Sequence, residues 1–295
     1  MANTFTNLDN DIIVHEALEA FTQALLPLKV FITDFSDAAT EKGEKINVPF
    51  VPEQSEAQAF TGTYTVQDAD AEGKDIYINK HNYVSWGLAD IEISKRPQIS
   101  MEVFGQQKGY KLAEKVLLDI LSAVTAANYG AAAKSGLSSA TFDTDEVLEV
   151  RQACTDSGMP KNSRALVLAS NYHTAILKDM KDASAVGSTS SLREGETGRL
   201  GGFSVYESTI LPDNAEGLVG FAAFPTGLIA AMRYVGPQKN KIMNEAYPVT
   251  DEETGITLGF RDWYEGKDAQ RIRVLECNYG YAVGNPAAIK RLTSA

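Results

Sequence analysis

The residue types that most often carry chemistry are sparse in this chain and do not cluster. The three histidines, His15, His81 and His173, pair neither with one another nor with cysteine at the spacing of a zinc site. The two cysteines, Cys154 and Cys277, lie far apart and in no CxxC pair, so they predict neither a disulfide framework nor a cysteine-rich zinc site. We expect Cys154 to be a small buried hydrophobe on a helix. The sequence contains no GxSxG nucleophile elbow and no GxxxxGK[ST] phosphate loop.

One acidic run matches the start of a metal-binding pattern. Asp68, Asp70 and Glu72 alternate and Gly73 follows them, as do the oxygen ligands and the glycine of a calcium loop. The twelfth position of that loop is Asn79 instead of a bidentate glutamate, and predicted strands flank the run where a calcium loop has helices. A solvated hairpin tip is therefore the favoured interpretation, with calcium binding as the alternative. The sequence predicts no cofactor and no metal.

Length and charge bound the class of protein. The chain has 295 residues, enough for one large domain or two ordinary ones with a sizeable core. The formal net charge is −12, which disfavours a dedicated reader of DNA. The first residues have no basic region followed by an apolar core, and the most apolar stretch, 217–232, is shorter than a membrane span. We expect a soluble protein made in a reducing compartment, with no membrane partner.

The first segment with a clear period is an amphipathic helix over 11–26, which Pro27 should end. Its apolar stripe includes Ile12, Ile13 and Phe21. The stripe either packs in the core of its own chain or serves as a terminal arm that docks on a neighbouring chain. Both interpretations stay open at this point.

An extended segment with few apolar residues follows. A short strand is predicted over 45–51, and the runs 61–67 and 74–80 both alternate around DADAEG, which predicts a β-hairpin. An isolated two-stranded hairpin is marginal in water, so the apolar face of this one should lean on another surface. The apolar residues on the two runs are Tyr64, Val66, Ile76 and Ile78.

The remainder of the chain predicts an α+β organisation. A further strand is expected over 83–94, and the strongest helical period runs over 106–128. A helix over 143–157 should have Asp143 as its N-cap. A long polar loop is predicted over 183–202, including Ser190, Arg193 and Arg199. The other predicted elements are a helix over 171–181 and strands over 165–169, 202–207, 217–223, 271–275 and 279–283.

This order of elements resembles the major capsid proteins of tailed bacteriophages of the HK97 type. The stretch YVSWGLADIEIS leading into GYKLAEKVLLDILSAVTAAN looks like the exit of that family's E-loop and its spine helix. The stretches ALVLASNYHTAILKD, GETGRLGGFSVYESTILPD and GLVGFAAFPTGLIAAMR look like its A-domain. The tail RIRVLECNYGYAVGNPAAIKRL looks like the strand that returns to the P-domain.

The resemblance implies a division of the chain: an N-terminal arm over 1–35, the E-loop with its flanking strands over 36–90, a P-domain over 91–140 and 246–295, and an A-domain over 141–245. It implies a non-enzymatic subunit that self-assembles into pentamers and hexamers of an icosahedral phage head around double-stranded DNA, without specific DNA binding. The implied location is the virion, after assembly in the host cytoplasm. Scaffolding, portal and decoration proteins would be separate partners.

Two alternatives stay open at the level of sequence. One is the shell of an encapsulin-like protein compartment, and the other is an α/β enzyme that uses an acidic pair, although neighbours such as Glu252 and Glu253 suit a solvated face. Under the capsid hypothesis, two sets of residues are candidates for contacts between subunits. The intersubunit set is Tyr64, Val66, Ile76, Ile78, Ile12, Ile13 and Phe21, and the set at the centre of each capsomer is Ser190, Arg193 and Arg199.

Overall fold

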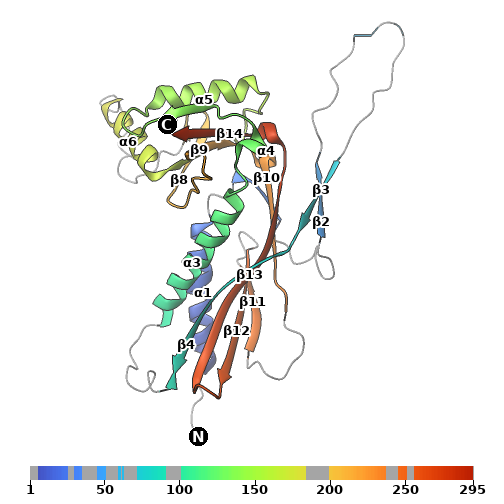
Figure 1. Ribbon diagram of the computed structural model, residues 1–295, viewed down its shortest axis with the longest axis vertical. Helices are drawn as coiled ribbons and strands as arrows, with labels where there is room; N and C mark the ends of the chain where they lie inside the picture. The colour runs from blue at the N-terminus through green and yellow to red at the C-terminus, as the bar shows by residue number, and fades with distance from the viewer. Residues whose placement is uncertain are drawn as a thin grey trace.

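The computed structural model describes most of the chain in several segments. These are residues 6–25, 30–34, 45–50, 59–60, 62, 72–90, 101–183, 199–236, 245–250 and 256–294. Within them the fold has a long sheet covered by two helices, a second sheet with its own two helices, and a separate two-stranded hairpin (Figure 1). No helix of the described residues is long and apolar enough to span a bilayer.

The long sheet forms the elongated part of the molecule, which we call the limb together with the two helices that cover it. Its strand order is β1 (Ile32–Asp34), β10 (Leu228–Arg233), β13 (Gln270–Val283), β12 (Thr257–Glu265) and β11 (Glu245–Thr250), and β4 (Lys80–Ala89) also pairs with β13. The β1–β10 pair is parallel and the other pairs are antiparallel. The two strands predicted over 271–275 and 279–283 are one strand, because the intervening residues Glu276 to Asn278 stay in register with β4.

Helices α1 (Thr6–Ala24) and α3 (Met101–Leu121) pack side by side on one face of the long sheet (Figure 1). Their axes come close where Gly109 faces Ala17, since a methyl group at Gly109 would lie 2.9 Å from both the Cα and the carbonyl carbon of Ala17. The apolar stripe of each helix enters one common core. Buried residues of this core from the two helices are Val14, Ala17, Leu18, Phe21, Leu112, Ala113, Val116, Leu117, Ile120 and Leu121.

Helix α3 differs from its prediction at both ends. It begins at Met101 instead of residue 106, and it ends at Leu121 instead of continuing to residue 128. The apolar period does continue, but the side-chain amide of Asn214 donates to the carbonyl oxygens of Leu121 and Val124, at 3.2 and 2.8 Å. The backbone itself continues for one 3₁₀-type turn, in which Val124 N–H donates to Leu121 O at 3.0 Å, and the Asn214 amide caps that turn. A separate short helix, α4 (Ala126–Tyr129), begins where Glu216 accepts from the backbone N–H of Ala126.

The second sheet forms a compact module at the other end of the molecule (Figure 1). Its order is β5 (Lys134–Leu137), β14 (Ile289–Ser294), β9 (Leu218–Ala223), β6 (Ala165–Ala169), β8 (Phe203–Ser208) and β7 (Arg199–Leu200). Helices α5 (Thr144–Asp156) and α6 (Ser170–Ala183) belong to this module. The predicted cap is confirmed, because the Asp143 side chain accepts from the N–H groups of Asp145 and Glu146. Cys154 is completely buried, as predicted.

Two short 3₁₀ turns join the sheets. Turn η4 (Pro225–Gly227) leads from β9 to β10, and turn η5 (Pro286–Ala288) leads from β13 to β14. The backbone links them, since Gly284 N–H donates to Gly227 O at 3.0 Å, and the Tyr129 hydroxyl donates to the same oxygen at 2.8 Å. The last strand, β14, therefore pairs inside the second sheet, whereas β10 pairs inside the long sheet.

The hairpin consists of β2 (Lys45–Phe50) and β3 (Glu72–Tyr77), paired antiparallel from Lys45↔Tyr77 to Phe50↔Glu72. The expected partner of the run 74–80 was 61–67, and the described partner is the earlier strand β2. The run 61–67 lies outside the described residues apart from Gly62. The run 74–80 is also divided, because Ile78 and Asn79 separate β3 from β4, and β4 spans 80–89 instead of 83–94.

Candidate functional site

The apolar residues proposed for intersubunit contacts on β3 are covered within their own chain. Ile76 is fully buried and Ile78 is 9% exposed, and both pack with Ile229 and Ala231 of β10. The hairpin was expected to pack against another surface because its apolar face is thin. That surface is the long sheet of the same chain. The burial of these two side chains leaves Ile76 no exposed area, and Ile78 little, for a contact with a neighbouring subunit. The other two residues of this group, Tyr64 and Val66, lie outside the described residues.

The helical stripe near the N-terminus shows the same preference for contacts in its own chain. Phe21 is fully buried in the core between α1 and α3. Ile12 and Ile13 lie in α1, and the structure does not describe their side chains. Of the two interpretations that the sequence left open, packing in the core holds for the described part of this stripe.

The capsomer-centre prediction falls mostly outside the described residues. Ser190 and Arg193 belong to the undescribed range 184–198. Arg199 is the first residue of β7 at the edge of the second sheet, and it is exposed. Its position leaves its side chain open to a partner.

The root of the hairpin holds a polar cluster that joins three elements. Asp119 of α3 accepts through Oδ2 from Lys80 Nζ at 2.7 Å and from the hydroxyl of Tyr279 at 2.6 Å. Lys80 Nζ also donates to the Tyr281 hydroxyl at 3.0 Å and lies 4.4 Å from the centre of that ring. Asn82 of β4 donates to the Tyr279 hydroxyl at 2.8 Å. We call these five residues the root cluster.

The electrostatics of the root cluster favour its charged form. Burial alone would raise the pKa of Asp119, but the hydrogen bonds from Lys80 and Tyr279 outweigh it and hold the pKa below its usual value. Burial would likewise lower the pKa of Lys80, and the hydrogen bonds to Asp119 and Tyr281 raise it instead. Burial and the bond to Asp119 together raise the pKa of Tyr279. The cluster therefore contains an ion pair between protonated Lys80 and ionised Asp119, and the hydroxyls of Tyr279 and Tyr281 hydrogen-bond to it.

Sequence reasoning missed the root cluster for a physical reason. Lys80 and Asp119 are separated by 39 positions, and Lys80 and Tyr281 by 201. No local period relates such residues. The one available signal is that Asp119 lies directly before Ile120, at the edge of the apolar stripe of α3.

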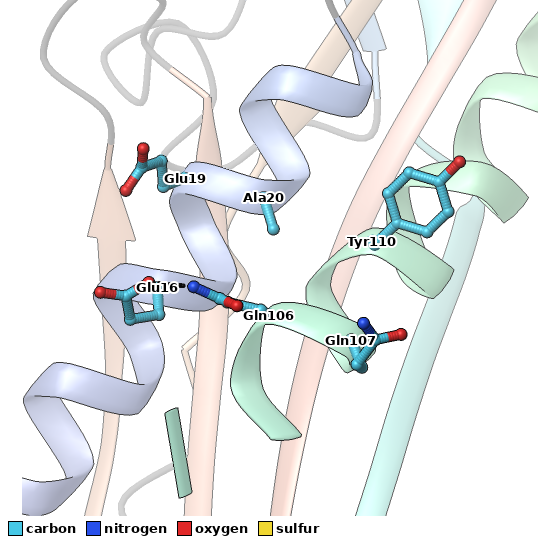
Figure 2. A pocket seen from close by; sticks show the side chains of 6 residues that line it. All are labelled: Glu16, Glu19, Ala20, Gln106, Gln107 and Tyr110. Carbon is cyan, nitrogen blue, oxygen red and sulfur yellow. Dashed lines mark hydrogen bonds between the residues drawn. The ribbon is translucent and has the colours of Figure 1, made fainter. Parts of the chain in front are cut away.

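An open pocket of about 420 Å³ lies between α1 and α3 on their outer side (Figure 2). Gln106 donates from its amide to Glu16 across it at 2.5 Å, as Figure 2 shows. The lining combines two carboxylates with two amides and a phenol. The residues that line it are Glu16, Glu19, Ala20, Gln106, Gln107 and Tyr110.

The remaining candidates for chemistry do not assemble a centre. His81 Nε2 lies 3.1 Å from Glu276 Oε2, and the buried His173 lies 3.7 Å from Glu207. His15 is exposed on α1. Among the described residues, no group of three or more histidine, cysteine or acidic side chains could hold a metal ion.

The calcium alternative and the acidic pair fall mostly outside the described residues. Asp68, Asp70, Glu252 and Glu253 lie outside the described residues. Glu72 and Gly73, which the sequence placed in the hairpin tip, begin β3 instead, and Asn79, which it placed in a strand, lies between β3 and β4.

Similarity between this chain and known proteins is found by comparing structures and not by comparing sequences. No protein-family model matches this sequence, and a search of curated proteins finds no match. The capsid of the cyanophage P-SCSP1u is similar with a TM-score of 0.61 and 12% identity, over 90% of this chain and 86% of that chain. The mature capsid of bacteriophage PhiM1 is similar with a TM-score of 0.58 and 12% identity, over 90% and 85%.

A third similar structure is a virus-like particle from Pyrococcus furiosus, with a TM-score of 0.54 and 12% identity over 95% of this chain and 97% of that chain. At these identities a likeness in structure establishes the fold and leaves the activity to separate argument. The order of elements, the long helix packed on a limb-like sheet, the separate hairpin and the α/β module agree with the organisation that the sequence resembled. The chain has the HK97-like capsid fold.

Proposed function

We propose that this chain is the major capsid protein of a tailed bacteriophage and that copies of it assemble into pentamers and hexamers of an icosahedral head. The observation that carries the proposal is the likeness to phage capsid structures over about nine tenths of both chains. The chain builds a shell in this proposal, and it catalyses no reaction. Its scaffolding, portal and decoration partners are separate proteins, and its final location is the virion.

The hairpin supports an assembly role. Strands β2 and β3 leave the long sheet as a two-stranded unit, and 21 residues, 51–71, connect Phe50 to Glu72. Such a unit is marginal in water unless another surface covers it. Its root leans on β10 of its own chain, and we assign cover for the connecting segment to an adjacent subunit, where a heterologous contact closes a ring.

The assembly experiment compares three forms of the full chain by electron microscopy and size-exclusion chromatography. In the first variant an Asn-Gly turn replaces residues 51–71 and closes the Phe50↔Glu72 pair directly. In the matched control a Gly/Ser linker of the same length replaces the same residues. We expect shells or capsomers from the natural chain, made alone or with its scaffold, and folded subunits without shells from both variants.

Each outcome has a definite meaning. Shells from the Gly/Ser variant alone would mean that length suffices and that the side chains of 51–71 make no specific contact. Normal shells from both variants would contradict the assembly role of the segment. A natural chain that stays a monomer at high concentration, with scaffold present, would contradict the capsid proposal itself.

The encapsulin-like compartment is the second candidate, favoured by the coverage of 95% and 97% against the Pyrococcus furiosus particle. The content of particles from cells that produce this protein naturally separates the two. A phage head protects double-stranded DNA from nuclease and absorbs strongly at 260 nm. A compartment instead carries one cargo protein in a fixed ratio to the shell protein, which mass spectrometry of washed particles would reveal.

A further inference from the structure

The hairpin crosses the long sheet over Gly280, Ala231, Ala282 and Ile229, of which the first three are small residues. Gly280 pairs with Ala231 across the β10–β13 ladder, and Ala282 pairs with Ile229. These four residues contact β3 on the face where Ile76 and Ile78 pack. A methyl group on Gly280 would lie 2.8 Å from the carbonyl carbon of Tyr77 and nearer still to its oxygen. The backbone of β3 therefore rests directly on the backbone of β13.

The opposite face of the same ladder carries the root cluster. Tyr279 and Tyr281 alternate with Gly280 along β13, so their side chains point away from β3. Both hydroxyls take part in the hydrogen bonds around Asp119 and Lys80. Lys80 pairs with Tyr279 as the first residue of β4. The chain thus leaves the hairpin on one face of β13 and is tied to α3 on the other within three residues.

We propose that the root cluster and Gly280 form a latch that fixes the direction of the hairpin relative to helix α3. Asp119 is a positioning residue in this latch, since it acts on the hairpin through Lys80. The ion pair sets where β4 begins, and the close approach at Gly280 sets how β3 crosses the sheet. The use of the latch in shell building rests on the proposed function, because a hairpin that reaches a neighbour must leave its own subunit in a defined direction.

Loss of the ion pair between Asp119 and Lys80 should affect the hairpin more than the long sheet or its helices. Asp119 and Lys80 are partly exposed, with side-chain exposures of 26% and 35%, so neither is required to fill the core. The apolar stripe of α3 is buried independently of them. Loss of the ion pair should therefore free the hairpin while the long sheet and the helices keep their packing. A residue that merely stabilised the limb would loosen all of these elements together.

Hydrogen–deuterium exchange read by mass spectrometry tests this selectivity. In Asp119→Asn, we expect the amides of β2 and β3 to exchange at least about tenfold faster than in the natural chain, since a charge-assisted hydrogen bond controls local opening. Exchange in β12 and β6 should stay unchanged. The matched control is Glu114→Gln, which removes a different ion pair of α3, between Glu114 and Lys111, where the Glu114 side chain is partly exposed like that of Asp119. It should leave the hairpin unchanged.

Two further variants test the latch on the two faces of β13, and each should perturb the hairpin less than Asp119→Asn does. Tyr281→Phe removes the hydroxyl that accepts from Lys80 and keeps the ring, so it should accelerate hairpin exchange by about threefold. Gly280→Ala should accelerate exchange in β3 through the clash with Tyr77. If Asp119→Asn fails to fold, Tyr281→Phe supplies the decisive reading.

The results that would overturn the latch are specific. Unchanged exchange in β2 and β3 in both Asp119→Asn and Tyr281→Phe would overturn it. An acceleration spread equally over the hairpin, β12 and β6 would do the same. Exchange can be read on subunits, capsomers or shells alike, so a failure to form shells would count against the proposed function and leave the latch to be judged by these rates.

Discussion

The close approach of α1 and α3 predicts that Gly109→Ala destabilises the protein, against the usual effect of this change in a helix. Alanine inside a helix is favoured over glycine by about 1 kcal/mol. At Gly109, however, the new methyl group would lie 2.9 Å from two backbone carbons of Ala17. Backbone atoms cannot rotate away, so the helices must separate, and overpacking of this kind costs about 1–3 kcal/mol. Subtracting the gain in helix propensity leaves a net loss of up to about 2 kcal/mol.

Urea unfolding of the unassembled subunit, followed by far-ultraviolet circular dichroism, measures this loss as a lower midpoint at an unchanged slope. Gly266→Ala is the matched control, since nothing lies within 4 Å of the position that its methyl group would take. An increased stability of Gly109→Ala would refute the reasoning, because it would show that helix propensity outweighs the contact with Ala17.

Three further predictions concern buried and charged groups. Because its folded pKa is lowered, the ionised carboxylate of Asp119 stabilises the fold above about pH 4, and this contribution is lost as the pH falls through the folded value; acid titration of Asp119→Asn should lack it. Burial raises the pKa of Cys154 to about 11 and that of Cys277 to about 12, so neither thiol should react with a maleimide at pH 7 until the protein is denatured. Asp262 is fully buried against Arg271, so Asp262→Ala should lower stability by about 2–4 kcal/mol in the same urea assay.

Elements with local causes were predictable from the sequence. The helix α5 begins where Asp143 caps it, and a cap is a relation between residues two and three positions apart. Strand β6 has the predicted bounds of 165–169, since a short run of apolar residues suits a strand buried on both faces. The amphipathic period of α3 predicted its buried stripe correctly.

Features that depend on residues far apart in the sequence could not be predicted in this way. At the end of α3 the carbonyl of Leu121 accepts from the amide of Asn214, 93 positions away, and the sequence around Leu121 continues the helical period without a break. The partner of β3 is also set at a distance, since β2 and β3 are separated by 21 residues. Alternation identifies a strand, but it does not say which other strand completes the ladder.

The site illustrates the same distinction at the level of side chains. A thin hairpin needs support, and that inference holds, but the support for Ile76 and Ile78 comes from their own chain. A contact between subunits has to cover side chains that the isolated chain leaves exposed. Tyr77 is 54% exposed at the end of β3, and Tyr83 is 63% exposed on β4. The alternation of apolar and polar residues identifies side chains that the subunit buries in its own core. Contacts between subunits should therefore be sought among the outward-facing residues of these strands.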